Sequence, residues 1–421
     1  MVASLFPLAI FFLLLGFPVF MAILIPSFAV LIQNFPNIAP DILLQQMVGG
    51  VNNFSILAIP FFIFAADVIS QGQIGKRLVN LANNMVGHIT GGLAIATIIT
   101  CLFFGAISGA GSAAVVAVGG IVYPILVEKG YKPNFVIGLV LASSSLAMLI
   151  PPSIAMILYS TVAPAASVRD LFSGGLILGI MVGVAFMVYS YFYAKKNKIQ
   201  KEEFIGFKNL GKAFVEAGWA LGFPIVILSG IYLGITTITE AAAVAVAYAI
   251  FVEVVIYKDL KLKELGSVAT KSGLIIAMLL VLIAAGKAIS YVMTIGGLPQ
   301  MINSLLGDYS VVVVLLLLTL IFLVAGMFID PNSAVIILVP LVAPVAFGLG
   351  VDPVHLGLII VFNLTIGMIT PPFGLNIFIA QSTFKLPYEK ILPGLVPFLA
   401  ISIGLLLVVT FVPDLIMWFK N

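Results

Sequence analysis

Charge is what this sequence has least of. Of its 421 residues only 8% are charged, whereas 62% are hydrophobic. A soluble domain carries roughly a quarter of charged residues, so this composition excludes an ordinary water-soluble domain. Apolar runs of about 20 residues recur along the chain, which is the length that crosses a bilayer as a helix. The composition therefore predicts a chain that is solvated mainly by lipid.

Cysteine and histidine are almost absent. The single cysteine, Cys101, excludes internal disulfides and a thiolate metal cluster. The two histidines, His88 and His355, are too few for a histidine-rich metal site, and we expect all three residues to be structural. An intramembrane hydrolase would need serine with lysine or histidine, an aspartyl pair or an HExxH motif, and none occurs at a suitable spacing. We therefore expect no enzyme.

Basic residues are missing from the N-terminal stretch, where the first is Lys76. We therefore interpret this stretch as a retained span and not as a cleaved signal peptide. All of the 19 Lys and Arg residues except Arg169, Lys287 and Lys420 fall in five polar connections, at 72–88, 127–133, 195–212, 258–271 and 384–390. The positive-inside rule assigns these connections to the cytoplasm, which predicts a cytoplasmic N-terminus and a periplasmic C-terminus.

Small residues interrupt one apolar run, which reads FFGAISGAGSAAVVAVGG from Phe103 to Gly120. The run lies in a segment of about 38 residues (89–126) between two predicted cytoplasmic connections. Two crossings would place this Gly/Ser cluster in an unsuitable external loop, so we favour a re-entrant hairpin that turns near mid-membrane. Close helix packing is the alternative explanation of such a cluster.

The chain contains a copy of itself at an offset of 220 residues. The offset relates Pro124 to Pro344, Pro133 to Pro353, and the pair Pro151-Pro152 to the pair Pro371-Pro372. The connection VEKGYKP of the first copy is basic, whereas the corresponding FGLGVDP has no basic residue. The copies therefore face opposite sides, which is the inverted-topology repeat of secondary transporters. We expect about nine full spans and two hairpins.

An interrupted helix is predicted after each hairpin. The two segments read LVLASSSLAMLIPPSIAMILYS and VFNLTIGMITPPFGLNIFIAQS. A proline pair removes two N–H donors and frees backbone carbonyls, which together with nearby hydroxyls suit a monovalent cation. The N-termini of half-helices at the same depth favour an anion. The pattern thus predicts one midplane site for an anionic solute and coupling cations.

Several motifs together resemble the large membrane subunit of tripartite ATP-independent periplasmic (TRAP) transporters. They are GAISGAGSAA, YPILVEKGY, GITTITEAAAVAVAYA, GMFIDPNSAVIILVP and ITPPFGLNIF. The resemblance implies an all-α integral membrane protein, an inverted-repeat elevator-type transporter with two re-entrant helical hairpins and two broken helices. It implies sodium-driven import of an organic acid, of the C4-dicarboxylate or sialic acid type, across a bacterial inner membrane. It also implies a periplasmic substrate-binding protein and a small membrane subunit, which we expect to be a separate chain.

The resemblance also implies site residues. Sodium ions, in two or more sites, would be held by Gly105, Ser108, Ser143, Ser144, Ser145, Gly326, Asp330, Asn332, Gly367 and Thr370. The solute would contact Ser108, Gly109, Ser153, Asn332 and Asn376. Some family members that carry sialic acid have a basic residue near position 298, whereas this chain has Gly296-Gly297-Leu298, which disfavours sialic acid.

The same resemblance divides the chain into a scaffold and a transport domain. The expected parts are scaffold helices with a first arm (1–86), a first transport half (87–194), a cytoplasmic linker (195–218), scaffold helices with a second arm (219–307) and a second transport half (308–421). The segments 72–88 and 293–307 are expected to be interfacial arm helices.

Other ionisable residues leave alternatives open. Asp330 could instead cap the helix that starts at Pro331. Asp67 and Lys287, also 220 apart, could form a scaffold ion pair, or Lys287 could meet the solute. Glu240 is expected to start a helix capped by Thr239. A stand-alone ion-coupled carboxylate carrier or antiporter with similar hairpins remains the alternative function.

Overall fold

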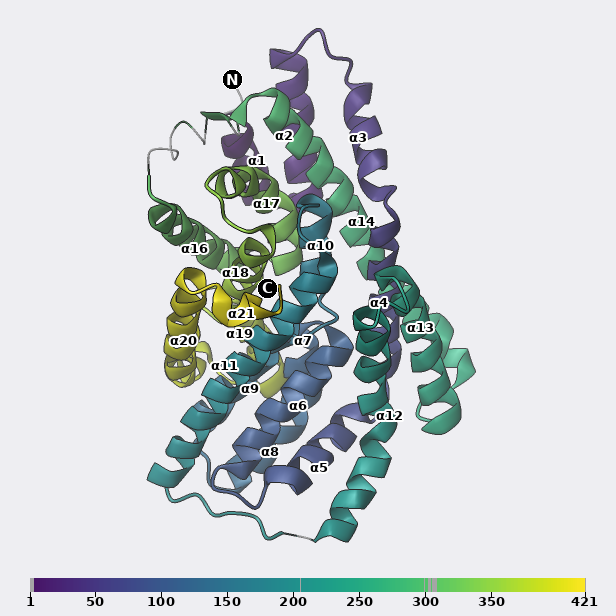
Figure 1. Ribbon diagram of the computed structural model, residues 1–421, viewed down its shortest axis with the longest axis vertical. Coiled ribbons are helices and arrows are strands. Elements are labelled where there is room, and N and C mark those ends of the chain that lie inside the picture. The colour runs from purple at the N-terminus through teal and green to yellow at the C-terminus, as the bar shows by residue number, and fades with distance from the viewer. Residues whose placement is uncertain (1–3, 205, 299, 302–303, 305–308, 421) are drawn as a thin grey trace.

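The computed structural model describes residues 4–204, 206–298, 300–301, 304 and 309–420, and these ranges form helices and no strands (Figure 1). In the first part of the chain the helices are α1 (Leu5–Leu14), α2 (Val19–Asn34), α3 (Asp41–Val51), α4 (Ala58–Ser70), α5 (Ile74–Val86), α6 (Gly92–Ser108), α7 (Gly111–Ala114), α8 (Gly120–Glu128), α9 (Pro133–Ser145), α10 (Ile154–Val162) and α11 (Val168–Lys196). In the second part they are α12 (Phe207–Tyr232), α13 (Ile238–Ile250), α14 (Leu265–Ile295), α16 (Val311–Phe328), α17 (Pro331–Gly348), α18 (Pro353–Gly367), α19 (Leu375–Phe384), α20 (Tyr388–Phe411) and α21 (Asp414–Met417).

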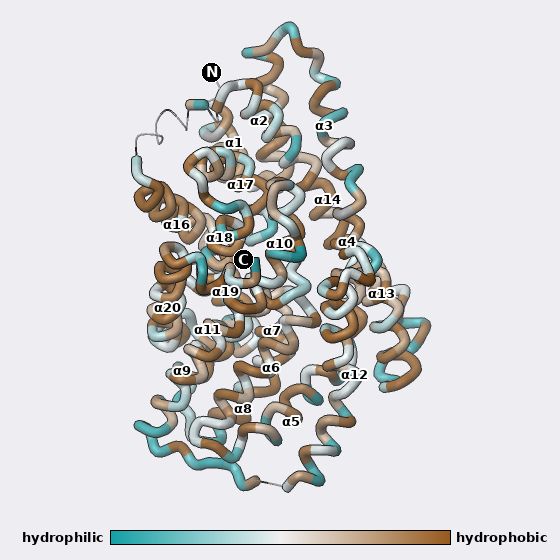
Figure 2. The backbone as a smooth tube through the Cα atoms, viewed as in Figure 1, coloured by the Kyte–Doolittle hydropathy of each residue, from teal (hydrophilic) through white to brown (hydrophobic). Residues whose placement is uncertain are grey.

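The helices have the length and composition of membrane spans. Within the described ranges, 8 helices are long and apolar enough to cross a membrane, or 9 if the bent pair α4–α5 counts as one. Figure 2 shows that hydrophobic residues dominate these helices, while hydrophilic residues gather in the linker between α11 and α12 and in the turn between α2 and α3. The chain is a multi-span membrane protein.

Both re-entrant hairpins are present. In hairpin 1, α6 ends at Ser108, and Gly109 turns the chain with a φ of 60°. A π-helical turn at Val115–Gly119 then joins α7 to α8. In hairpin 2, α16 and α17 are separated only by Ile329 and Asp330. The positive φ explains the glycine at the first tip, because this region is costly for other residues.

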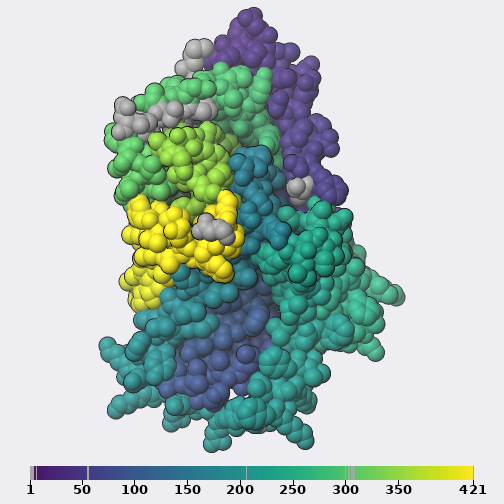
Figure 3. All heavy atoms as spheres, in the orientation of Figure 1, coloured from purple at the N-terminus to yellow at the C-terminus, as the bar shows by residue number. Residues whose placement is uncertain are grey.

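The sequence repeat is a two-fold relation in space. Gly138 of α9 has no room for a Cβ because the carbonyl oxygen of Gly394 in α20 occupies that place. Gly174 of α11 is closed in the same way by the side chain of Leu358 in α18. Adding 220 to 138 and 174 gives 358 and 394, so one contact occurs twice. The last long span of each half therefore packs against the broken helix of the other half, and in Figure 3 the C-terminal helices lie directly on the first half.

The first arm is a helix of its own. Helix α5 turns by 73° from α4, and its buried side includes Ile74, Leu78 and Leu81 while Lys76 faces outward. This geometry agrees with an arm that lies beside the helices of hairpin 1. The second expected arm, 293–307, falls partly outside the described residues, and the division into scaffold and transport domain stays a prediction.

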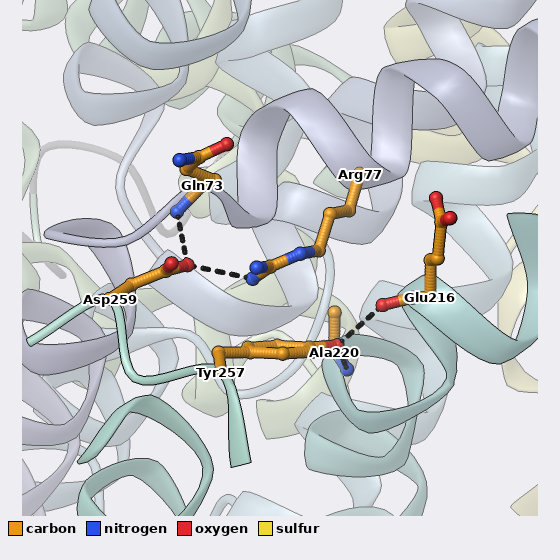
Figure 4. A network of polar contacts seen from close by, with 6 residues as sticks. All are labelled: Gln73, Arg77, Glu216, Ala220, Tyr257 and Asp259. Atoms are coloured by element: carbon orange, nitrogen blue, oxygen red, sulfur yellow. Dashed lines mark hydrogen bonds and ion pairs between the residues drawn. The ribbon is translucent and has the colours of Figure 1, made fainter. Parts of the chain in front are cut away.

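An ion pair fixes the start of α5 to the helices of the second half (Figure 4). The Arg77 guanidinium lies 2.8 Å from the Asp259 carboxylate and 3.6 Å from the centre of the Tyr257 ring. The Tyr257 hydroxyl donates to the Glu216 carbonyl at 2.8 Å and accepts from the Ala220 N–H at 3.3 Å. One arginine thus connects α5 to both the loop before α14 and helix α12. We call these five residues the elbow cluster.

In each half of the chain, a surface ion pair joins the turn after a hairpin to a segment that follows the last long span. In the first half, Glu202 in the linker pairs with Lys129 after hairpin 1 at 2.6 Å. In the second half, Lys420 near the C-terminus pairs with Asp352 after hairpin 2, also at 2.6 Å. The sign of the charges is exchanged between the two pairs.

One expectation about polar residues was wrong, and one alternative that the sequence left open is not found in the structure. Thr237, not Thr239, caps α13 and forms a capping box with Glu240, while the Thr239 hydroxyl donates to the Phe54 carbonyl at 3.1 Å. Asp67 does not pair with Lys287, because its carboxylate accepts from the Ser272 hydroxyl at 2.5 Å. Equivalent places in a repeat need not be neighbours in space.

The elbow cluster makes a stability prediction. We expect Arg77→Met or Asp259→Asn to lower the melting temperature in detergent by a few degrees, because each change leaves the partner charge half-buried and unpaired. The double variant should lose little more than the worse single variant, since both remove one interaction. Lys212→Met breaks an exposed pair with Glu216 at 3.9 Å and should have almost no effect. Additive losses at Arg77 and Asp259 would contradict the proposed coupling.

Candidate functional site

A small cavity lies between the two hairpin tips. Its volume is about 90 Å³. Both hairpins and both interrupted helices contribute to its lining, which consists of Gly109, Ala110, Gly111, Ser112, Met148, Ile154, Ala155, Asp330, Pro331, Asn332, Met368 and Leu375. We call it the tip cavity. Of the predicted site residues, it contains Gly109, Asp330 and Asn332.

Both predicted helix interruptions are confirmed. Helix α9 ends at Ser145 and α10 begins at Ile154, with Pro151-Pro152 between them. Helix α18 ends at Gly367 and α19 begins at Leu375, with Pro371-Pro372 between them. Both proline pairs are joined by cis peptide bonds. The freed backbone groups lie beside the hairpin tips, because a Cβ on Gly109 would lie 2.6 Å from the Pro152 carbonyl oxygen.

The serine run at the end of α9 is completely buried. Ser145 donates to the Leu141 carbonyl at 2.9 Å, and Ser144 lies 3.7 Å from the sulfur of Cys101. The Ser143 hydroxyl has no hydrogen-bond partner among the described atoms. A buried hydroxyl without a partner is unfavourable in lipid, so the Ser143 oxygen is available to an additional ligand.

Asn376, in the second half of the chain, contacts the interrupted helix of the first half. Its side-chain amide donates to the Ser145 hydroxyl at 3.0 Å, while its own oxygen has no recorded partner. Gly111 makes this approach possible, since a Cβ there would lie 3.1 Å from the Ser144 carbonyl oxygen and 3.3 Å from the Asn376 amide nitrogen. The sequence identified Asn376 but neither Gly111 nor this contact between halves. The only signal for Gly111 was its position two residues after the hairpin turn.

The second interruption uses glycine and not serine. A Cβ on Gly367 would lie 2.6 Å from the Gly326 Cα, so the backbones of α16 and α18 touch. In the first half a Cβ on Gly105 would meet the Ala147 Cα at the same distance of 2.6 Å. Thr370 donates to the Ile366 carbonyl at 2.7 Å. At both interruptions, therefore, the backbone of the first hairpin helix packs directly against the interrupted helix.

Asp330 does cap α17, as one of its two proposed roles required. One carboxylate oxygen accepts from the N–H groups of Asn332 and Ser333, each at 3.1 Å, and the other accepts from the Ser333 hydroxyl. Asp352, also followed by proline, caps α18 through Val354 and His355 in the same way. Burial opposes ionisation of Asp352, but Lys420 and these N–H groups together hold its pKa below the usual value. Only Asp330 of the two lines the tip cavity.

The remaining predicted residues lie around the tip cavity. Ser108 is 6% exposed and contacts the backbone of Ala110, whereas Ser153 is fully buried and caps α10 by accepting from the Met156 N–H at 3.4 Å. His355 bonds the Val409 carbonyl at 2.8 Å, which agrees with a structural role. Over the described ranges no three His, Cys, Asp or Glu side chains group as a metal site. Ligands for a cation here would be hydroxyl, amide and backbone oxygens and the Asp330 carboxylate.

Substitution of Gly367 tests the contact between backbones. Alanine normally favours a helix over glycine by about 1 kcal/mol. We nevertheless expect Gly367→Ala to lower the melting temperature in detergent, because neither backbone can move aside without separating α16 from α18. Gly348→Ala is the matched control, since it also ends a helix and a Cβ there meets nothing within 4 Å. Equal melting temperatures for the two variants would contradict this packing.

Comparison with known proteins agrees with this architecture. The family described as tripartite ATP-independent periplasmic transporter, DctM component, matches residues 6–415. The chain is similar to the ectoine/5-hydroxyectoine TRAP transporter large permease protein UehC of Ruegeria pomeroyi, with 38% identity covering 100% of this chain and 99% of that protein. It is similar to the C4-dicarboxylate TRAP transporter large permease protein DctM of Vibrio cholerae, with 35% identity covering 99% and 97%.

A solved structure shares the fold. The YdaH transporter of Alcanivorax borkumensis superposes with a TM-score of 0.64 over 90% of this chain and 88% of that one, at 15% identity. The curated relatives are permease subunits, which confirms the expectation of a transporter component and not an enzyme. Since the family match spans nearly the whole sequence and the relatives exceed 30% identity along it, the chain belongs to the DctM family of large permease subunits of TRAP transporters.

Proposed function

We propose that this chain imports a small carboxylate-bearing solute through the tip cavity, coupled to sodium, by an elevator movement of the hairpins and broken helices. The single observation that carries the proposal is the composition of the tip cavity. Both hairpin tips and both interrupted helices line it, so solute bound there would touch corresponding elements of both halves of the inverted repeat. Secondary transporters bind substrate and coupling ions at this kind of repeat interface.

The proposed anion site uses helix N-termini. Helices α7, α10, α17 and α19 begin within a few residues of the tip cavity, at Gly111, Ile154, Pro331 and Leu375. The N-terminal end of a helix carries a partial positive charge, which favours a negatively charged group nearby. Asn332 and Ser112 add polar side chains. A single carboxylate on a small solute fits a cavity of about 90 Å³ better than a large sugar acid does.

The proposed sodium ions lie on either side of the solute. Support for the first site is the unpartnered Ser143 hydroxyl and Asn376 oxygen beside the α9 interruption. Support for the second is the Asp330 carboxylate, which lines the tip cavity at the start of α17. Sodium is a hard ion that oxygen donors of these kinds suit, and a monovalent ion needs few of them to be charged.

The names of the relatives narrow the range of solutes that we propose. One is named for ectoine and 5-hydroxyectoine, and another for C4-dicarboxylates. Ectoine carries one carboxylate and one delocalised cation, whereas a C4-dicarboxylate carries two carboxylates. We propose a solute of one of these two sizes and keep sialic acid as the less favoured type. A periplasmic binding protein would deliver it, and a separate small membrane subunit would complete the transporter, with the N-terminus in the cytoplasm.

Uptake into proteoliposomes tests the proposal. We expect uptake of a small carboxylate only with the binding protein, the small subunit and an inward sodium gradient, across a panel that includes ectoine, succinate and sialic acid. Full uptake by this chain alone would instead identify the stand-alone carboxylate carrier. Equal uptake with and without a sodium gradient would show that sodium is not the coupling ion.

Asp330 offers a sharper test of the sodium site. Asn is as good a helix cap as Asp, so Asp330→Asn keeps the start of α17 while removing the charge. We expect the sodium concentration for half-maximal uptake to rise roughly tenfold, because a hydrogen bond or contact to a charged group is worth about 1.5–3 kcal/mol. Ser108→Ala should have a milder effect in the same direction.

The matched control is Asp352→Asn, which changes an equivalent Asp-Pro cap away from the tip cavity. Its sodium dependence should equal that of the unmodified protein. Equal sodium dependence in Asp330→Asn and Asp352→Asn would argue that Asp330 only caps its helix.

A further inference from the structure

Lys287 is a cation within a predicted membrane span and has no acidic partner among the residues that the structure describes. It lies in the second half of α14, and its side chain is half-buried. Four ion pairs are recorded among the described residues, and Lys287 belongs to none of them. Ionisable residues at such depth are expensive and are usually functional. Asp67, one possible partner, accepts a hydrogen bond from the Ser272 hydroxyl instead.

The Lys287 ammonium instead reaches the C-terminal end of α10. It donates to the carbonyl oxygen of Thr161 at 3.3 Å. Thr161 is the second-last residue of α10, which ends at Val162, so its carbonyl lacks an intrahelical donor. No other donor to this carbonyl is recorded in the described part of the chain. A cation at this end of a helix also meets the negative end of the helix dipole.

The path of the lysine side chain is built into the fold. A Cβ on Gly50 of α3 would overlap the Lys287 Cγ and lie 2.9 Å from the Lys287 Cβ. Gly50 therefore opens a channel along which the side chain runs from α14 past α3 to α10. The neighbouring Gly286 is packed in the same way against Ile336 of α17. At this point of α14, two consecutive residues contact two different elements of the proposed transport domain.

These contacts join parts that the proposed function requires to move against each other. Helices α3 and α14 fall in the predicted scaffold, whereas α10 and α17 fall in the predicted transport domain. A lysine that is fixed along α3 and bonds the end of α10 can make this bond in one position of the transport domain only. A displacement of a few ångströms removes the ammonium from its acceptor.

We propose that Lys287 is a positioning residue that selects the conformation seen in this structure by capping the C-terminus of α10, and that transport requires this contact to break. This inference rests on the elevator movement under the proposed function. Its ligand is the protein itself, so the solute and the sodium ions need not contact Lys287. Removing the charge should therefore change the balance between conformations while leaving solute and sodium recognition intact.

The experiment measures the two conformations directly. Spin labels on cysteines introduced at Val188 of α11 and Val244 of α13 report the distance between the proposed transport domain and scaffold in lipid nanodiscs. Both side chains are exposed, at 50% and 42%. Double electron–electron resonance then gives the population at each distance, in the full chain with the small subunit.

We expect Lys287→Met to reduce the population at the distance of this structure about fivefold relative to the second distance, which corresponds to about 1 kcal/mol, a usual contribution of a cation at a helix C-terminus. Lys287→Arg, which keeps the charge, should stay close to the unmodified protein. Gly50→Ala should act like Lys287→Met because it displaces the side chain. Gly49→Ala is its matched control, since a Cβ there meets nothing within 4 Å.

The outcomes distinguish the proposed role of Lys287 from the elevator movement itself. If two distances are seen and neither Lys287→Met nor Gly50→Ala changes the ratio of their populations, the role of Lys287 is overturned and the elevator movement stands. A single unchanging distance in all variants, with and without sodium, would overturn the elevator and the role of Lys287 with it. A higher half-saturating sodium concentration in Lys287→Met, with unchanged distances, would show a role in ion binding and would also overturn the proposal.

Discussion

The structure depends on one constraint, which is that lipid offers no partner to a bare backbone group. Both interrupted helices leave carbonyl and N–H groups near the middle of the chain's apolar mass, and each interruption is covered by protein. Gly105 and Ala147 close one side of the first interruption, and Gly326 and Gly367 close the corresponding side of the second. Asn376 then crosses from the second half to Ser145 of the first. The same enclosure that makes the breaks tolerable also collects oxygen atoms into a small, shielded space.

Much of this architecture could be predicted from the sequence, because it follows from local rules. The 220-residue offset of the prolines predicted both interruptions, and a glycine at 109 marked the turn that its positive φ requires. The order Asp330-Pro331 predicted a capped helix start, and the structure has one. Each of these signals acts between residues that are close in the chain, so sequence alone carries them.

The errors concern contacts between distant segments. The offset left a pair of Asp67 and Lys287 open as one alternative, but residues related by a two-fold axis touch only if they lie close to that axis. Asp67 finds Ser272 and Lys287 finds Thr161 instead. Thr239 is the threonine next to Glu240, but Thr237 also lies close enough to cap α13. In the structure the Thr239 hydroxyl bonds the Phe54 carbonyl, and Thr237 is the cap. The sequence placed Gly111 in the small-residue run but did not predict its contact, since the Asn376 side chain that needs its missing Cβ lies in the other half.

The exchange of last spans between halves has a consequence for how the chain is made. In the finished protein, Gly394 of α20 covers Gly138 of α9. Gly394 is synthesised 256 residues after Gly138 (394 minus 138), so this face of α9 is uncovered in the meantime. At about 5–20 residues per second, that interval lasts tens of seconds. During it, the insertion machinery or the lipid itself must cover the face of α9 that contains Gly138. Synthesis of α20, and not completion of the first half, is therefore the step that allows this contact to close.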